Sequence, residues 1–323
     1  MSVFLSIQDL HVVFTTYVGR IHAVNGASLA AKRGESVGIV GETGCGKSTV
    51  GFAIVRLLEG TGRVVQGQVF LEGENLLDKD EREMREIRKK RISLIFQDPT
   101  SSLNPVQTIG AQLSEALIAS KNLPKDQAAA RTIALLSTLG IPDPAAFVGH
   151  YPHEISGGMR QRVMIAIALS KDPALLIADE PTSNLDVTIQ AQILDILRRM
   201  KEEMGMTILL ITHDMGVVAQ TCDKVAVMYA GAVVEFGEVR RVFSRSMHPY
   251  TRGLLKVANL VGEKTRLENI PGLVPDLAVL PIGCLYSSRC PLAKDACLKF
   301  RPELVDLGDG HFVACPVTSA RNT

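Results

Sequence analysis

The sequence has 323 residues, of which 46% are hydrophobic and 21% charged, with a formal net charge of +1. This length suits one large domain with an appendage or two modest domains, and the hydrophobic content supports a sizeable core and argues against disorder. The balanced charge gives no electrostatic footprint for nucleic acid or for an acidic membrane surface.

Targeting and membrane-spanning patterns are not evident. The first residues, MSVFLSIQDLHVVF, lack the basic and long apolar regions of a secretory signal. The longest apolar runs, such as MTILLI, are far shorter than the roughly 18 residues that suggest a bilayer span. We therefore expect a soluble intracellular protein. In such a reducing compartment, clustered cysteines favour metal ligation over disulfides.

The first third of the chain alternates between strands and short helices. A β-rich run is predicted over about 5–29, a strand at SVGIV (36–40) and a helix from Lys47 to about Leu58. Glycines between alternating apolar residues predict a hairpin over 62–76. The charge density of 81–91 indicates a solvated helix face, and 92–97 is predicted as a buried strand.

Helical periodicity then dominates from about 99 to 171, in the segments 108–120, 126–140 and 158–170. Strands at 174–180 and 207–212 flank a predicted helix at 187–205, and a hairpin is predicted at 224–238. This order favours an α/β core with helices on its faces and a helical insertion. The proline- and glycine-bearing run at 268–283 indicates a boundary before a cysteine-rich tail.

A phosphate-binding motif follows the strand at 36–40. Residues 41–48, GETGCGKS, match G-x-x-x-x-G-K-[ST] between a strand and a helix. Its glycines let backbone N–H groups face phosphates, Lys47 would reach the β- and γ-phosphates, and Ser48 would ligate Mg²⁺. Cys45 lacks an evident activating base, so we interpret it as a tolerated small residue. The predicted nucleotide-binding residues here are Gly41, Glu42, Thr43, Gly44, Cys45, Gly46, Lys47, Ser48 and Thr49.

Two adjacent acids end the strand LLIADE. Asp179 is placed to hold Mg²⁺ through water, and Glu180 to polarise an attacking water as general base. The alternative is that these acids cap the next helix. The P-loop upstream favours the catalytic interpretation, with phosphoryl transfer to water as the reaction.

The stretch ISGGMRQRVMIAIAL at 155–169 resembles the signature motif of ABC-type ATPases. The P-loop, this signature, ADEPTSNLD and LLITHD occur in the order of that family, over about residues 5–255. The resemblance implies a P-loop NTPase ABC-type ATPase domain with an antiparallel β-subdomain and a helical subdomain at about 99–171. In that family the nucleotide lies between two subunits. Ser156, Gly157 and Gly158, at a helix N-terminus, would then face the P-loop of the partner.

Further residue roles follow from the same resemblance. Gln97 matches the glutamine that senses Mg²⁺ and the attacking water, His213 the histidine that contacts the γ-phosphate, and Asp186 the loop that crosses the dimer interface. Alone, Gln97 could be an ordinary strand-end amide and His213 a capping or core imidazole. Phe14, with Tyr17 as runner-up, matches the aromatic that stacks on adenine, and a plain core role is equally compatible with either. The intact motifs predict an active ATPase.

The tail resembles a particular group of these proteins. RSMHPYTRGLLKV (245–257) and PGLVPDL (271–277) are similar to the ATP-binding subunits of oligopeptide and dipeptide importers, a group that includes nickel and some oligosaccharide systems. That group often carries four tail cysteines associated with a [4Fe–4S] cluster, which Cys284, Cys290, Cys297 and Cys315 match. Four thiolates suit such a cluster, which would brace a tail with little core of its own. Zinc, unpaired thiols and a disulfide remain alternatives.

The sequence therefore predicts an ATPase domain at 1–255 and a small cysteine-bearing C-terminal extension at 256–323. By the resemblance, the chain binds and hydrolyses ATP with Mg²⁺ to energise peptide import, with two transmembrane permeases, a second and homologous ATPase, and an extracellular substrate-binding protein. Nickel or oligosaccharide import and a non-transport ABC ATPase are the alternatives. No nucleic-acid partner is expected, and the predicted location is peripheral, at the cytoplasmic face of the inner membrane.

Overall fold

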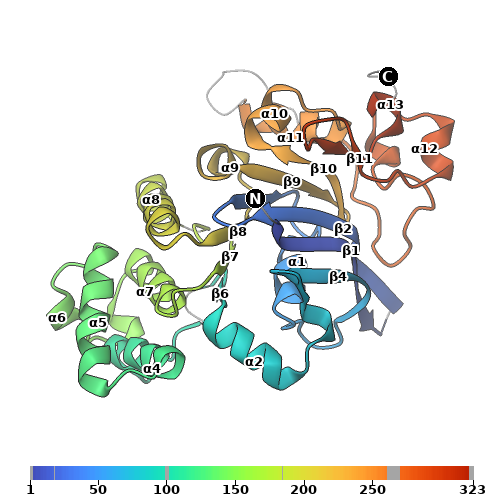
Figure 1. Cartoon of the computed structure of the whole chain (residues 1–323). Helices are drawn as coiled ribbons and strands as arrows, with labels where there is room; N and C mark the ends of the chain where they lie inside the picture. Colours follow the sequence, from blue (N-terminus) through green and yellow to red (C-terminus); the bar gives the residue numbers. More distant parts are fainter. Residues whose placement is uncertain (1–2, 18, 99–101, 184, 260–269, 320–323) are drawn as a thin grey trace. The chain divides into compact units, whose positions relative to one another are not determined.

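The structure, a computed structural model, describes residues 3–17, 19–98, 102–183, 185–259 and 270–319 (Figure 1). The chain divides into two compact units. Unit 1 comprises Met1–Asp78 and Leu210–Thr323, and unit 2 comprises Lys79–Leu209. The beginning of the predicted helical stretch (99–101) and of the predicted boundary run (268–269) lie outside the described residues.

An antiparallel sheet of unit 1 has the strand order β2-β1-β4-β5. The predicted β-rich run is confirmed as two 14-residue strands, β1 (Val3–Thr16) and β2 (Gly19–Lys32), whose pairing contains bulges. The predicted hairpin at 62–76 is also confirmed, as β4 (Arg63–Leu71) and β5 (Glu74–Asn75). Its turn forms at Glu72 and Gly73, both of which have positive φ.

The second sheet of unit 1 has the order β11-β12-β10-β9-β3. The predicted strand β3 (Ser36–Val40) is entirely buried and runs parallel to β9 (Lys224–Tyr229), which forms the predicted hairpin with β10 (Ala232–Glu238). The short strands β12 (Phe312–Val313) and β11 (Val305–Asp306) extend this sheet. The C-terminal tail therefore extends the sheet that contains β3.

The helices of unit 1 are short. Helix α1 (Lys47–Ile54) ends earlier than predicted, because Arg56 adopts a left-handed backbone conformation with φ 54°. A shared apolar core joins β9 residues to Tyr250 on α11 and to Leu285 and Tyr286 of the tail. The other helices are α9 (Met215–Thr221), α10 (Val239–Ser244), α11 (Pro249–Asn259), α12 (Asp295–Lys299) and α13 (Pro316–Ser319).

Unit 2 contains most of the helical residues. Helix α2 (Glu81–Lys90) starts with a capping box between Asp80 and Glu83 and buries only Met84 and Ile87, so the predicted solvated face is confirmed. The predicted helices are confirmed, and α4 to α7 gather in one group (Figure 1). Their bounds are α4 (Ile109–Lys121), α5 (Lys125–Thr138), α6 (Pro144–Phe147), α7 (Gly157–Leu169) and α8 (Val187–Met204).

Buried strands of unit 2 lead into the predicted catalytic residues. β6 (Ile92–Ile95) pairs in parallel with β7 (Leu175–Asp179), and β8 (Thr207–Ile211) continues from unit 2 into unit 1. β7 and β8 are buried along their whole length, which explains why they consist of apolar runs without alternation. In the part of the chain that is described, no helix has the length and apolar character needed to cross a membrane.

Candidate active site

The P-loop lies in unit 1 between β3 and α1. Gly44 and Gly46 have φ values of 80° and 94°, which L side chains rarely adopt. A Cβ on Gly46 would also lie 2.2 Å from the carbonyl oxygen of Ala23. No side chain caps α1 at Gly46, so the helix N-terminus is shaped to receive an anion, as the motif predicts.

Lys47 is the first residue of α1 and is buried, with 5% exposure. Its Nζ donates hydrogen bonds to the carbonyl oxygens of Gly41 (2.9 Å) and Glu42 (3.0 Å). The ammonium group is therefore held by the loop that would surround the phosphates. Ser48 and Thr49 follow in the first turn of the same helix.

Cys45 is buried inside this loop. Burial raises the pKa of its thiol, and the nearby Lys47 ammonium opposes that shift. A thiol with a raised pKa is a poor nucleophile, so this environment fits the small inert residue that we expect at the position.

In unit 2, Gln97 and Glu180 meet just beyond two parallel strands. Gln97, which follows β6, donates from Nε2 to Oε2 of Glu180 at 3.2 Å. Asp179 ends β7 and is 4% exposed. Glu180 has a φ of 45°, a conformation that is strained for a residue with a side chain and that is frequent at functional sites.

The alternative role for the two acids, capping the following helix, belongs instead to Asp186. Its side chain accepts a hydrogen bond from the N–H of Ile189 at 3.0 Å, and α8 begins directly after it. The cap of α8 is thus Asp186 and not Asp179 or Glu180. Asp186 is exposed, as a residue at a subunit interface would be in a single chain.

The signature residues begin α7. Ser156 caps the helix by accepting from the N–H of Met159 at 3.3 Å. Ser156 and Gly157 are exposed, and a Cβ on Gly157 would meet nothing within 4 Å. The N-terminus of α7 is therefore open to solvent, as a phosphate site completed by another subunit requires.

The remaining predicted residues lie in unit 1. His213 is exposed and follows β8, whereas the cap of α9 is provided by the neighbouring Asp214, which accepts from the N–H groups of Gly216 and Val217. Phe14 is partly buried in β1 opposite Ile21. Tyr17 is fully exposed in the turn after β1. The nucleotide roles of His213, Phe14 and Tyr17 stay predictions.

The tail cysteines require a correction. Cys284 and Cys290 pack against the apolar cluster of Tyr286, whereas Cys315 belongs to a separate cluster with Met247. Burial, and to a smaller extent the neighbouring thiols, raises the pKa of Cys284 to about 11.

Among the described residues, no group of three or more His, Cys, Asp or Glu side chains is arranged to hold a metal ion. The predicted [4Fe–4S] cluster at Cys284, Cys290, Cys297 and Cys315 is therefore wrong, and the zinc alternative is equally unsupported. The tail is braced by packing instead, because Leu285 and Tyr286 lie in the same apolar cluster as Tyr229 and Tyr250.

Sequence reasoning missed one feature of the P-loop. Glu42 forms an ion pair with Arg289 of the tail, 247 positions further along the chain, and its N–H donates to the Tyr250 hydroxyl. Arg289 stands between two cysteines in a segment without periodicity, so no local pattern distinguishes it from a surface arginine.

Comparisons with known proteins agree with this geometry. Residues 24–183 match the ABC transporter family, and residues 234–297 match the C-terminal region of oligopeptide/dipeptide transporters. The chain is 46% identical to a probable peptide ABC transporter ATP-binding protein of Sinorhizobium fredii, covering 96% of this chain and 94% of that one. It is also 46% identical to the dipeptide transport ATP-binding protein DppD of Bacillus subtilis, covering 98% and 95%.

The fold has counterparts among solved structures. The dimeric ATP-binding cassette MJ0796, bound to ADP and phosphate, is 28% identical with a TM-score of 0.66, covering 73% of this chain and 99% of that one. The fold and the P-loop define an ATPase of the ATP-binding cassette class. At the identity and coverage given above, the chain belongs to the oligopeptide/dipeptide family of ABC transporter ATP-binding proteins. It is an ATPase that uses ATP with Mg²⁺.

Proposed function

We propose that this chain hydrolyses ATP to energise peptide import, as a peripheral subunit at the cytoplasmic face of the inner membrane. Its relatives' names support peptide as the cargo class. In this proposal two transmembrane permeases form the path, an extracellular binding protein delivers the peptide, and a second, homologous ATPase completes the dimer. The domain division at about residue 255 is part of the same proposal.

One observation carries the dimeric mechanism: the open N-terminus of α7. Within the described part of the chain, two helix N-termini are suited to phosphate: the P-loop at α1 and the signature at Ser156, Gly157 and Gly158. A single ATP is held by the P-loop of one subunit and the signature of the other. Asp186 then lies in the loop that crosses between the subunits.

Each of the site residues has its own role in ATP hydrolysis. Lys47 and the P-loop N–H groups bind the β- and γ-phosphates, which neutralises charge that develops in the transition state. Ser48, Gln97 and Asp179 would hold Mg²⁺, which when bound would supply polarisation of the phosphate oxygens. Glu180 takes the proton of the attacking water, oriented by the Gln97 amide, and His213 contacts the γ-phosphate. Phe14, with Tyr17 as the alternative, stacks on adenine.

The cargo is tested by transport. The purified chain, its partner ATPase and the two permeases would be reconstituted in vesicles with the binding protein, and uptake of labelled peptides would be measured with ATP on the ATPase side. We expect ATP-dependent peptide uptake that disappears with Glu180→Gln in this chain. ATP-dependent uptake of nickel or oligosaccharide without peptide uptake would contradict the peptide assignment while leaving the ATPase function in place.

A further inference from the structure

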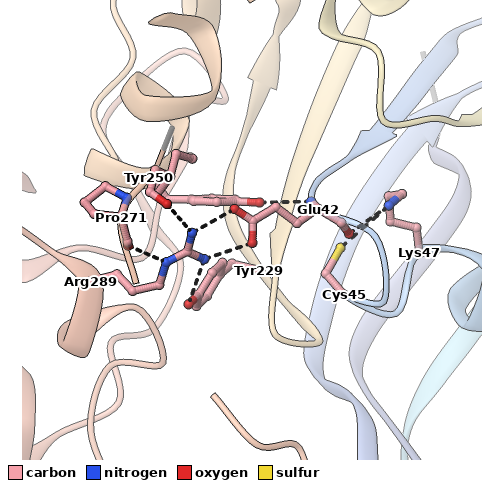
Figure 2. Close-up of polar contacts among 8 residues, drawn as sticks. Glu42, Cys45, Lys47, Tyr229, Tyr250, Pro271 and Arg289 are labelled. Carbon is pink, nitrogen blue, oxygen red and sulfur yellow. Dashed lines mark hydrogen bonds and ion pairs between the residues drawn. The ribbon is translucent and has the colours of Figure 1, made fainter. Parts of the chain in front are cut away.

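The guanidinium of Arg289 is buried where the C-terminal tail meets the P-loop (Figure 2). The side chain is 4% exposed. Its Nε donates to the carbonyl oxygen of Pro271 and its Nη2 to that of Ile270, each at 3.0 Å. These two bonds fix the plane of the guanidinium within unit 1 and leave the outer edge of the fork facing Glu42.

Both carboxylate oxygens of Glu42 accept hydrogen bonds from this guanidinium. Nη1 of Arg289 lies 2.8 Å from Oε2 and Nη2 lies 3.0 Å from Oε1, the bidentate geometry that gives the best directional control. Tyrosine rings enclose the pair: the guanidinium carbon lies 5.6 Å from the ring centre of Tyr229 and 6.0 Å from that of Tyr286. The Glu42 side chain is 27% exposed, so the pair is partly shielded from water.

The main chain of Glu42 is held as well. Its N–H donates to the hydroxyl of Tyr250 at 3.0 Å, and its carbonyl oxygen accepts from Nζ of Lys47 at 3.0 Å (Figure 2). A continuous set of contacts therefore runs from Arg289 through Glu42 to the lysine that the P-loop places for the phosphates. A buried ion pair is weak evidence of stability in itself, because desolvation offsets much of the attraction. We therefore consider how this ion pair orients Glu42.

We propose that Arg289 is a positioning residue for ATP: by holding Glu42 in place, it keeps the P-loop and Lys47 in the conformation that receives the phosphates. The C-terminal extension is thereby a structural part of the nucleotide site rather than an independent appendage. This inference rests on the P-loop role proposed above, and it goes further by making ATP affinity depend on a tail residue that does not touch the nucleotide.

A double-mutant cycle on the full chain tests this role. The variants are Glu42→Gln, Arg289→Gln and their combination, with Mg-ATP affinity measured by calorimetry and thermal unfolding measured in parallel. We expect each single variant to weaken Mg-ATP binding by about tenfold, and the combination to weaken it no further, because both changes remove the same contact. In the assembled ATPase, KM for ATP should rise while kcat changes little.

Two further variants keep the test decisive. Arg289→Lys retains the charge but loses the bidentate hydrogen bonding of the guanidinium, so we expect it to fold and to bind Mg-ATP with intermediate affinity. This variant keeps the test usable if Arg289→Gln does not fold. Arg301→Gln, an exposed arginine of the same extension whose Nη2 donates to Pro281, should bind Mg-ATP like the parent chain. Parent-like affinity in Arg289→Lys and Glu42→Gln, with only a lowered melting temperature, would overturn the proposal and leave Arg289 a structural tether. Unchanged ATP binding in Lys47→Ala would instead refute the P-loop role itself.

Discussion

The Nε2 amide of Gln97 donates a hydrogen bond to the carboxylate of Glu180, although the two residues are 83 positions apart in the sequence. The contact pairs the residue expected to sense Mg²⁺ with the residue expected to activate water. The hydrogen bond constrains the Glu180 carboxylate, so the orientation of the proposed general base depends on Gln97.

Removing this amide should therefore slow hydrolysis without preventing ATP binding. We expect Gln97→Ala to lower the steady-state ATPase rate by at least about tenfold, because the base loses its orienting partner and the metal loses a ligand. Phosphate release by the assembled transporter measures this. The control is Gln127→Ala, an exposed glutamine on α5, which should match the parent. Equal rates for both variants would refute the role of Gln97.

Lys47 should contribute directly to the affinity for Mg-ATP. Its ammonium is buried among the carbonyls of Gly41 and Glu42, so Lys47→Ala removes the only side-chain cation that the P-loop motif supplies. We expect Mg-ATP affinity to fall by about a hundredfold, the size of a lost charge-assisted contact. Titration with a fluorescent ATP analogue measures the affinity. Lys256→Ala, on the exposed side of α11, should bind like the parent.

The signature serine should act on hydrolysis and not on the chain's own ATP binding, because its proposed phosphate partner lies in another subunit. Ser156→Ala removes the cap of α7, at a cost of about 1 kcal/mol in unfolding free energy. Thr108→Ala removes the matching cap of α4 and controls for that loss. We expect both variants to melt similarly and only Ser156→Ala to lose ATPase activity. Loss of activity in both would mean that helix capping alone explains the effect.

A buried histidine makes stability depend on pH. Burial lowers the pKa of His248 to about 4 from 6.5, with Glu235 opposing and Arg252 adding to the shift. Between these values the unfolded chain binds more protons, so the unfolding free energy falls as pH drops from 6.5 to 4, by up to about 3 kcal/mol from this group.

His248→Asn tests that linkage. Asparagine retains an acceptor for the Tyr250 N–H, which donates to Nδ1 of His248 at 3.1 Å, but does not titrate. Denaturant unfolding at pH 6.5 and pH 4.5 should show a smaller loss of stability in this variant than in the parent. His153→Asn, at an exposed position, should retain the full loss. A loss in His248→Asn equal to that of the parent would contradict the pKa assignment.

Local chemistry explains what the sequence predicts correctly. The strands β3, β7 and β8 are largely apolar runs, and Gly44 and Gly46 of the P-loop have φ values that L side chains rarely adopt. Such signals lie within a few residues of the element they specify, so they are visible without a structure.

Long-range packing explains what was missed or wrong. The pairing of Arg289 with Glu42 depends on how the tail packs against the core, which no local pattern encodes. The four cysteines match a ligand spacing, yet among the described residues no group of three or more His, Cys, Asp or Glu side chains is arranged to hold a metal ion. A spacing motif does not specify whether the thiols converge on one centre.

The most direct test of the account is Glu180→Gln, since it removes the general base and keeps the shape and hydrogen-bonding capacity of the side chain. Hydrolysis by the purified ATPase pair would be followed together with the mass of the complex in Mg-ATP. The account predicts at least about a hundredfold slower turnover and accumulation of an ATP-bound dimer, because binding is intact and water activation is lost. Normal turnover in Glu180→Gln would contradict the assignment of Glu180 and the hydrolysis mechanism built on it.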